Sequence, residues 1–327
     1  MIQRKMLTKK KIVAIIQARV TSSRFPNKIF QKIKNKSLID ILIERLKKSK
    51  TINKIVLAIP NNIENKIIKK KVKNSVSIFY GSEKDVLDRY YRAAKKFKAN
   101  IIVRICGDCP LIDPKVIDNI IETYNKNDFD YVSNTIDPTF PDGLDVEVFN
   151  FEVLKKTWKE AKTDKERENV TEYILQKSKF KKKNISFKKN LSFIRLTIDE
   201  KIDLEQIKKV YLKLYKNKYF GIDEIFKLYK INKNLFKINS EIKRNEGSVL
   251  STGQKYWKRA KNIIPGGNML LSKRPEMFLP DKWPAYYTKA KGCYVWDLDS
   301  IKYSDMSLMS VGTNILGYSN KDIDDAV

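Results

Sequence analysis

Short runs rich in β-branched residues alternate with longer amphipathic stretches over the first half of the chain. The expected strands are 11–17, 54–60, 76–81, 100–106 and 130–134, and the expected helices between them are 37–49, 62–72, 85–97 and 114–126. This β-α-β-α alternation is typical of a mainly parallel sheet with helices on both faces. Such α/β folds bind ligands beyond the carboxyl ends of their strands. The loops that begin at Ala18, Pro60, Gly81, Gly107 and Asn134 should therefore share one rim.

The alternation then gives way to other patterns. Residues 139–158 predict a turn, a strand and the start of a helix, 164–178 a helix, 193–215 a strand that runs into a helix at about Lys201, and 221–232 a last helix. A shift toward Trp, Tyr, Met, Gly and Pro places a boundary near residue 248. We expect one domain over 1–247 and a second over 248–327.

The composition limits the classes of protein that the chain can belong to. It has 327 residues, 42% of them hydrophobic, which is enough for a substantial core. No apolar run reaches the roughly 18 to 20 residues that cross a bilayer, and the basic start is not followed by an apolar signal segment. We therefore expect a cytoplasmic protein without a membrane span.

The chain has three cysteines and no histidine, which excludes Ser-His-Asp hydrolysis and His-zinc chemistry. Cys106 and Cys109 have C-x-x-C spacing, but no second pair follows, so structural zinc is not expected. An odd, sparse set of cysteines suits a reducing compartment.

The net charge of +29 raises the alternative of a nucleic-acid-binding protein. The lysines are scattered through every segment, however, and no aromatic-basic strand motif accompanies them. We therefore expect no nucleic-acid partner.

The segment AIIQARVTSSRFPNKIF, residues 14–30, carries the clearest chemical signal. Backbone amides, hydroxyls and cations gather where the first strand ends, at Ala18, Arg19, Ser22, Ser23, Arg24 and Lys28. These are the donors that a nucleoside triphosphate demands, although the loop is not a Walker motif. The alternative from this loop alone is a solvated connector.

Two aspartates stand at expected strand ends. Asp108 follows Gly107 at the end of the strand 100–106, where a carboxylate can hold Mg²⁺ against phosphate oxygens. Asp199 precedes the helix at Lys201 and could instead be its N-cap.

Seven motifs in fixed order carry a resemblance: IIQARVTSSRFPNKIF, GSEKDVLDRYYRAA, VRICGDCPLIDP, YVSNTIDPTFPDGLDVEVF, RENVTEYI, RLTIDEKIDL and RNEG. Over residues 11–247 the chain resembles the nucleotidyltransferases of the spore-coat polysaccharide biosynthesis type, which are related to the acylneuraminate and 3-deoxy-manno-octulosonate cytidylyltransferases. The resemblance implies a Rossmann-like, glycosyltransferase-A-type fold that transfers CMP from CTP to a sugar or sugar acid with Mg²⁺.

The resemblance also implies residue roles. The catalytic set would be Arg19, Lys28 and Asp108, and Asp108 and Asp199 would hold the metal. The nucleotide would contact Ala18, Arg19, Ser22, Ser23, Arg24, Lys28, Gly81, Arg104 and Asp108. Arg89 has two interpretations, a contact to the nucleotide or, as we favour, an ion pair with Asp85 one helical turn away.

The acceptor is expected against residues 141–149 and 165–173. Asp142, Asp145 and Glu147 could bind sugar hydroxyls, and Arg167 could hold a carboxylate or phosphate in bidentate fashion. The alternative is a charged rim over a hairpin and a helix cap. Asn169 stands where relatives commonly carry His, so no acid-base role is expected there.

Residues 251–327 resemble the opening segment of class III pyridoxal-phosphate-dependent aminotransferases of the glutamate-1-semialdehyde aminomutase type. The cofactor-binding Lys and Asp of that family lie beyond the matching segment, so we expect neither pyridoxal phosphate nor transaminase activity here. The parent polypeptide is expected to be a fusion or to have been truncated, with apolar surface exposed around Trp283, Tyr286, Trp296 and Met309.

Three matters stay open from the sequence. A non-catalytic nucleotide-sugar-binding module on the same fold is an alternative to the enzyme, the acceptor is undefined, and the resemblance leaves a homodimer as one possible assembly.

Overall fold

The computed structural model describes residues 10–22, 24–72, 76–215, 219–242, 244, 251–280, 282–306 and 315–327. The chain divides into two units, Met1–Glu241 and Ile242–Val327. The domain boundary predicted at residues 247 and 248 lies outside the described residues and stays a prediction. Among the described residues, no helix combines the length and the apolar character that a membrane span requires.

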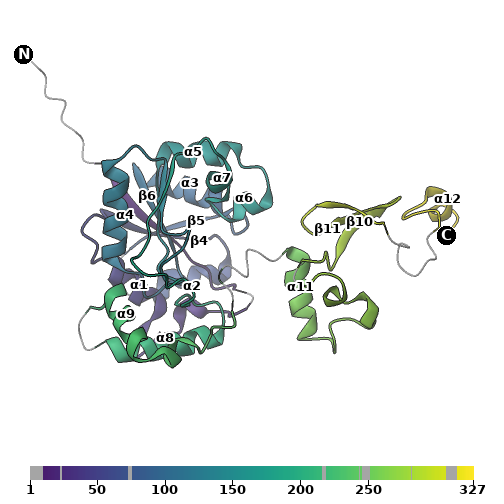
Figure 1. Cartoon of the computed structure of the whole chain (residues 1–327). Coiled ribbons are helices and arrows are strands. Elements are labelled where there is room, and N and C mark those ends of the chain that lie inside the picture. Colours follow the sequence, from purple (N-terminus) through teal and green to yellow (C-terminus); the bar gives the residue numbers. More distant parts are fainter. Residues whose placement is uncertain are drawn as a thin grey trace, which may run out of the picture. The chain divides into compact units, whose positions relative to one another are not determined.

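A seven-stranded sheet forms the centre of the first unit (Figure 1). Its strands are β1 (Ile12–Gln17), β4 (Lys54–Pro60), β5 (Ser77–Gly81), β6 (Ile101–Cys106), β7 (Tyr131–Ser133), β8 (Glu147–Asn150) and β9 (Lys182–Asn184). They lie in the order β5-β4-β1-β6-β8-β7-β9, and only β8 runs antiparallel to its neighbours. The predicted α/β fold with a mainly parallel sheet is confirmed.

Helices cover both faces of this sheet. They are α1 (Leu38–Leu46), α2 (Ile63–Lys71), α3 (Val86–Lys96), α4 (Pro114–Lys126), α5 (Phe151–Glu160), α6 (Asp164–Glu168), α7 (Glu172–Gln176), α8 (Lys201–Leu214) and α9 (Ile222–Ile231). In Figure 1, α3, α5, α6 and α7 gather on one side, with α1, α8 and α9 on the other. Each face has its own apolar core.

Strand β1 shows why the sequence pattern works. Ala14 and Ile16 enter the core with α1, α4 and α8, whereas Val13 and Ile15 enter the core with α3 and α5. All four side chains are fully buried. A strand covered on both faces reads as a continuous apolar run rather than an alternating one.

Two local predictions need correction. Residues 193–199 form no strand of the sheet, because their backbone pairs only in one isolated bridge, from Arg195 to Asp142. The predicted helix 164–178 breaks into α6 and α7, since Val170 takes a positive φ of 26° between them. Short elements complete the unit: the 3₁₀ turns η1 (Lys28–Phe30) and η2 (Lys233–Phe236), and the hairpin β2 (Lys32–Ile33) and β3 (Lys36–Ser37).

The second unit contains α11 (Thr252–Lys261) and α12 (Lys321–Asp324), two 3₁₀ turns, η3 (Leu271–Lys273) and η4 (Pro275–Met277), and an antiparallel sheet of β10 (Tyr287–Lys291), β11 (Tyr294–Asp297) and β12 (Lys302–Ser304). Met269 is 97% exposed and Ile315 is 91% exposed. Of the predicted apolar surface, Trp283 is exposed and Tyr286 and Trp296 are half-buried, while Met309 lies outside the described residues.

Candidate active site

The candidate site lies where β1 and β6 end. The chain goes from β1 to β4 and β5 on one side of the sheet and then crosses to β6 on the other, so these two carboxyl ends flank the switch in strand order. Gly107 lets the two strand ends meet, because a Cβ there would lie 2.7 Å from the Gln17 carbonyl oxygen and 2.9 Å from the Ala18 Cβ. The segments that follow β1 and β6 therefore start side by side.

The segment after β1 is held against the unit by side chains from α2 and from the loop that follows β5. Asn65, a fully buried residue of α2, accepts a hydrogen bond from the Val20 backbone N–H at 2.8 Å. Thr21 donates to Glu83 at 2.6 Å. Asn27 takes a left-handed φ of 57° just before η1, and its N–H donates to the Val20 carbonyl at 3.0 Å. This folding brings Lys28 back over the strand ends.

Lys28 joins the two predicted metal carboxylates. Its Nζ donates to Asp108 Oδ2 at 2.9 Å, to Asp199 Oδ1 at 2.9 Å and to the Ile198 carbonyl at 2.7 Å. The Lys28 side chain is only 9% exposed. Burial by itself would lower the pKa of Lys28, but Asp108 and Asp199 raise it above its usual value, so the ammonium stays charged.

Asp199 is held from both sides. Lys28 and Arg24 contact Oδ1, the latter at 3.2 Å, and Arg195 donates to Oδ2 at 2.9 Å. Burial would raise the pKa of the Asp199 carboxyl, but these three cations lower it to about 2. Asp199 is therefore ionised at every physiological pH, and its side chain is still 23% exposed. It does not cap α8, because Asp203 forms the capping interactions there.

The other predicted nucleotide-binding residues lie around this centre, at the ends of β1, β5 and β6. Ala18 is buried, Ser22 half-buried, and Arg19 and Arg24 exposed, while Ser23 lies outside the described residues. Arg19 forms no ion pair with a carboxylate of the described residues. Burial lowers the pKa of the neighbouring Arg89, and the charge of Arg19 lowers it further. The neighbouring cations Arg19 and Arg89 favour an anionic ligand.

Arg89 does not make the predicted ion pair with Asp85. Its guanidinium donates to the Ser82 carbonyl, whereas Asp85 accepts from Arg167 and caps α3 through the Asp88 N–H. Gly81 packs directly on Arg89, since a Cβ at Gly81 would lie 2.9 Å from the Arg89 Cγ. The prediction that Asp85 neutralises Arg89 is thus wrong, because Arg167 reaches Asp85 from α6.

The predicted acceptor residues are divided between two places. Asp142 is buried and pairs with Arg195 at 3.0 Å, and Asp145 is half-buried near it in sequence. Glu147 pairs with Arg104 across the β6–β8 register, and its Oε2 is buried without a hydrogen-bond partner among the described residues. Arg167 holds Asp85 at 2.5 and 3.0 Å.

Asn169, which ends α6, donates from its side chain to the Lys165 carbonyl at 3.1 Å.

The cysteines near the site are not nucleophiles. Burial raises the pKa of Cys106 to about 12 and that of Cys109 well above its usual value, so neither thiol is expected to ionise at neutral pH. Over the described ranges, no three Cys, Asp or Glu side chains are grouped as a metal site.

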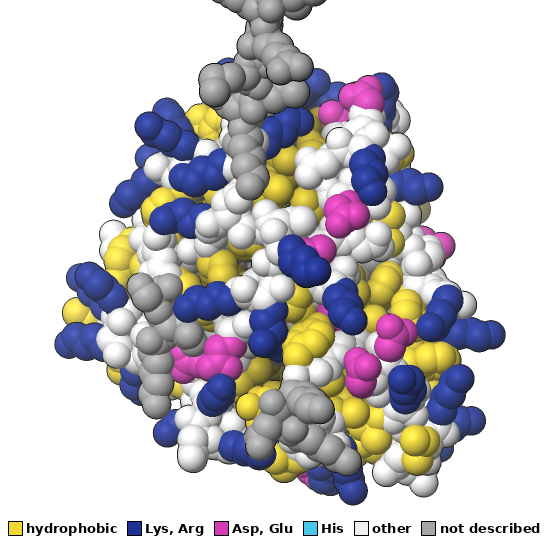
Figure 2. Space-filling model, turned by 90° about the vertical axis from the view of Figure 1, so that its left-hand side faces the viewer, with side chains coloured by type: hydrophobic (Ala, Val, Ile, Leu, Met, Phe, Trp, Pro, Cys, Tyr) yellow, Lys and Arg dark blue, Asp and Glu magenta, His cyan; other side chains and the backbone are white. Residues whose placement is uncertain are grey.

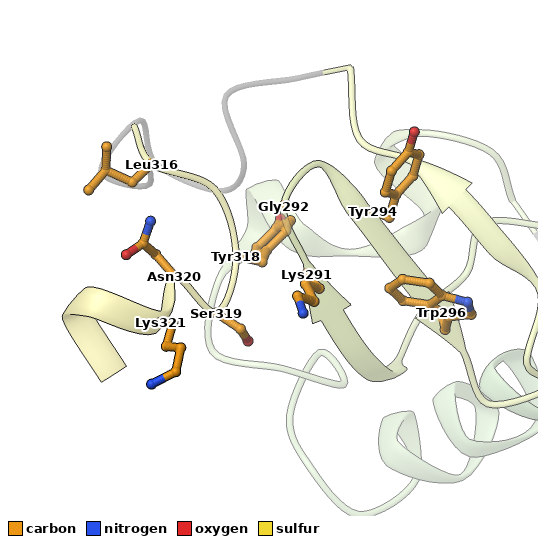
Figure 3. Close-up of a pocket in the computed structure, with 9 residues that line it drawn as sticks. All are labelled: Lys291, Gly292, Tyr294, Trp296, Leu316, Tyr318, Ser319, Asn320 and Lys321. Atoms are coloured by element: carbon orange, nitrogen blue, oxygen red, sulfur yellow. The ribbon is translucent and has the colours of Figure 1, made fainter. Parts of the chain in front are cut away.

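Charge and hollows elsewhere do not compete with this site. On the face shown in Figure 2, Lys and Arg side chains are spread among hydrophobic and acidic ones instead of forming one continuous patch. A hollow of about 470 Å³ lies in the second unit, lined by aromatic residues such as Tyr294 and Trp296 and by Lys291 and Lys321 (Figure 3). Its lining contains no carboxylate.

The sequence patterns missed two members of the site, Arg195 and Asp203. Arg195 was placed on an expected strand, where no pattern indicates a role, and Asp203 reads as an ordinary helix residue. The one available signal was the spacing of Arg195, Asp199 and Asp203 at intervals of four in FIRLTIDEKIDL.

Comparisons with known proteins agree with this fold. Residues 13–235 match the family model for cytidylyltransferases. An uncharacterized protein of Methanocaldococcus jannaschii is 40% identical over 241 residues, 72% of this chain and 96% of that protein. The spore coat polysaccharide biosynthesis protein SpsF of Bacillus subtilis is 31% identical over 236 residues, 68% of this chain and 95% of that protein.

A solved structure and two partial matches complete the comparison. A cytidylyltransferase from Leptospira borgpetersenii has a TM-score of 0.67 and 31% identity, and the alignment covers 69% of this chain and 97% of that one. A 3-deoxy-manno-octulosonate cytidylyltransferase of Solibacter usitatus is 32% identical over 109 residues, 33% of this chain and 43% of that protein. A 3-aminobutyryl-CoA aminotransferase of Cloacimonas acidaminovorans is 36% identical over 78 residues, 24% of this chain and 18% of that protein. By its family model, full-length relatives and fold, the chain belongs to the cytidylyltransferases and is a nucleotidyltransferase.

Proposed function

We propose that the first unit transfers CMP from CTP to a sugar-type acceptor, with Mg²⁺ as its metal and pyrophosphate as the leaving group, in the synthesis of a surface polysaccharide. The observation that carries this proposal is the convergence of Asp108 and Asp199 on one ammonium group at the switch between β1 and β6. Two carboxylates that share a cation partner, with the exposed cations Arg19 and Arg24 in the neighbouring segment, suit a metal-bound triphosphate.

The donor set fits Mg²⁺. This ion is usually held by one or two protein carboxylates and completes its shell with water and phosphate oxygens. Asp108 and Asp199 would supply those two carboxylates, and both side chains are about a quarter exposed, at 26% and 23%. When bound, Mg²⁺ would offset the negative charge that gathers on the phosphates.

The residues of this chain then perform binding and orientation. Arg19 and Arg24 are exposed cations in the segment after β1 and would hold the phosphates of CTP. An acceptor oxygen attacks the α-phosphorus in line, the bond from that phosphorus to the oxygen that bridges to the β-phosphate breaks, and pyrophosphate leaves with those electrons. A hydroxyl acceptor releases its proton to water. Lys28 would stabilise the charge that develops on the phosphates, and catalysis rests on positioning and electrostatics without a covalent intermediate.

The acceptor would lie beside residues 141–149. The unpartnered Oε2 of Glu147 is an acceptor for a hydroxyl group, since a buried carboxylate oxygen left without a donor is costly. The name of one partial match, a 3-deoxy-manno-octulosonate cytidylyltransferase, favours a sugar acid, which would give a CMP-linked product from a hydroxyl, over a sugar phosphate, which would give a CDP-linked one.

A binding experiment tests the nucleotide and the metal together. Thermal stability of the purified chain is measured with CTP, UTP, GTP or ATP, each with and without Mg²⁺. Stabilisation by CTP that requires Mg²⁺ and is lost in Asp108→Ala supports the proposal, and release of pyrophosphate is then screened with sugar acids and sugar phosphates. Equal shifts with all nucleotides, independent of Mg²⁺, would refute it, because they would reflect only attraction of polyanions to a basic surface.

The partial match to an aminotransferase supports a separate proposal for residues 248–327, namely an opening segment of a class III aminotransferase joined to the nucleotidyltransferase. Mass spectrometry of the native gene product tests it, since a protein that ends at Val327 would contradict a fusion.

A further inference from the structure

Arg195 is a buried cation that three carboxylates share at one side of the candidate site. Its side chain is 5% exposed. Nε donates to Asp203 Oδ1 at 2.9 Å, Nη1 to Asp142 Oδ2 at 3.0 Å, and Nη2 to Asp199 Oδ2 at 2.9 Å. All three nitrogens are engaged, and the planar guanidinium fixes the directions of these bonds.

Asp203 anchors this guanidinium to helix α8. It is fully buried, and its Oδ2 accepts from the backbone N–H groups of Asp199 and Glu200 at 2.8 and 2.9 Å. Asn239 donates to Asp203 Oδ1 at 2.7 Å. One carboxylate therefore fixes both the Arg195 side chain and the backbone of Asp199.

Asp142 ties the same guanidinium to the turn at 141–144, which lies in the segment where the acceptor is expected. The turn is seated directly on the chain around Arg195, because a Cβ at Gly143 would lie 2.4 Å from the carbonyl carbon and oxygen of Leu196. The Asp142 N–H donates to the Ile194 carbonyl at 2.9 Å, and the Leu196 N–H donates to the Asp142 carbonyl at 2.6 Å.

We infer that Arg195 is a positioning residue that directs the Asp199 carboxylate toward the metal and fixes its place relative to the 141–144 turn. The inference rests on the proposed function, since it assigns Asp199 to the metal. By occupying Oδ2, Arg195 leaves Oδ1 facing Lys28 and Arg24. Partners of a metal-binding carboxylate commonly change metal affinity or activity about 10- to 100-fold when they are replaced.

A purely structural role for Arg195 would not require its bond to Asp199. Asp203 alone meets the guanidinium with two bonds, from Nε at 2.9 Å and from Nη2 at 3.2 Å, in the paired geometry that arginine and carboxylate favour. Asp142 adds a buried partner, whereas the bond to Asp199 reaches out of the core to a side chain that is 23% exposed at the rim. That bond adds little to packing and fixes a functional group.

The test measures Mn²⁺ binding in the presence of CTP by electron paramagnetic resonance, for the wild type and for Arg195→Lys. Lysine keeps the buried charge, but one ammonium cannot span three carboxylates in the directions that the guanidinium serves. Arg92→Lys is the matched control, because Arg92 is 63% exposed and pairs with Asp88 at 2.7 Å on α3. Asp142→Asn is a second variant, which removes one of the three anchors. Binding is measured at a temperature where circular dichroism shows every variant to be folded.

We expect Arg195→Lys to bind Mn²⁺ about 10- to 100-fold more weakly, Asp142→Asn to be intermediate and Arg92→Lys to match the wild type. Folded Arg195→Lys with wild-type Mn²⁺ affinity would overturn the inference, as would an equal loss in Arg92→Lys. If Arg195→Lys does not fold, Asp142→Asn decides, and an unchanged affinity there overturns the inference. A wild-type protein that fails to bind Mn²⁺ with CTP would instead overturn the metal in the proposed function.

Discussion

The substitution Lys28→Met tests the charge balance at the centre of the site. Among the described residues, Lys28 alone forms ion pairs with both Asp108 and Asp199, and its side chain is 9% exposed. Removing one partner of a buried ion pair typically costs about 3 to 5 kcal/mol, because the remaining charge is left uncompensated. Here the two carboxylates keep some access to water, so we expect the lower end, about 3 kcal/mol.

For a unit of this size a loss of 3 kcal/mol lowers the melting temperature by roughly 6 to 12 °C. The assay is thermal unfolding followed by circular dichroism, without metal and with millimolar MgCl₂. Because Lys28→Met leaves two carboxylates facing each other without their ammonium, Mg²⁺ should restore more stability to the variant than it adds to the wild type.

The matched control is Lys36→Met. Lys36 Nζ lies 2.6 Å from Glu44 Oε2, a shorter contact than those of Lys28, but the two side chains are 43% and 39% exposed. Exposed pairs contribute about 0 to 1 kcal/mol, so this variant should melt within a few degrees of the wild type. Equal melting temperatures for Lys28→Met and Lys36→Met would refute the reasoning that burial sets the cost.

Three further predictions concern single groups. The pKa of Asp199 is about 2 against a usual value of 3.8, which stabilises the folded state by roughly 2 kcal/mol at neutral pH, and this contribution is lost as the pH falls from about 4 to 2. The acid unfolding of Asp199→Asn should lack this contribution. An acid transition identical to that of the wild type would contradict the assignment. Asp108→Asn should abolish pyrophosphate release at saturating Mg²⁺ while the fold persists, and full turnover would remove Asp108 from the metal site. Gly143→Ala should lower the melting temperature by several degrees, because Gly143 has a φ of +101° and a Cβ would meet the Leu196 backbone, and an unchanged melting curve would show that the turn can shift.

Much of the fold could be predicted because its signals are local. Strands β1, β4 and β6 are mostly buried and the edge strand β5 is half-buried, and each is an apolar run that an amphipathic helix follows. Their carboxyl ends then had to share one edge, which is why Lys28 and Asp108 could be placed at one rim. The break between α6 and α7 and the irregular path of 193–199 left no comparable pattern, because both follow from packing against distant residues.

The α/β architecture, the family and the candidate cations and carboxylates of the site could be read from the sequence alone, since these depend on periodicity and on motifs of a few residues. How those groups are paired could be seen only in the folded chain. There, Asp85 forms an ion pair with Arg167 and not with Arg89, and Arg195 forms ion pairs with Asp142, Asp199 and Asp203. Ion pairing is a choice among several oppositely charged side chains, and only the distances set by the folded chain make that choice.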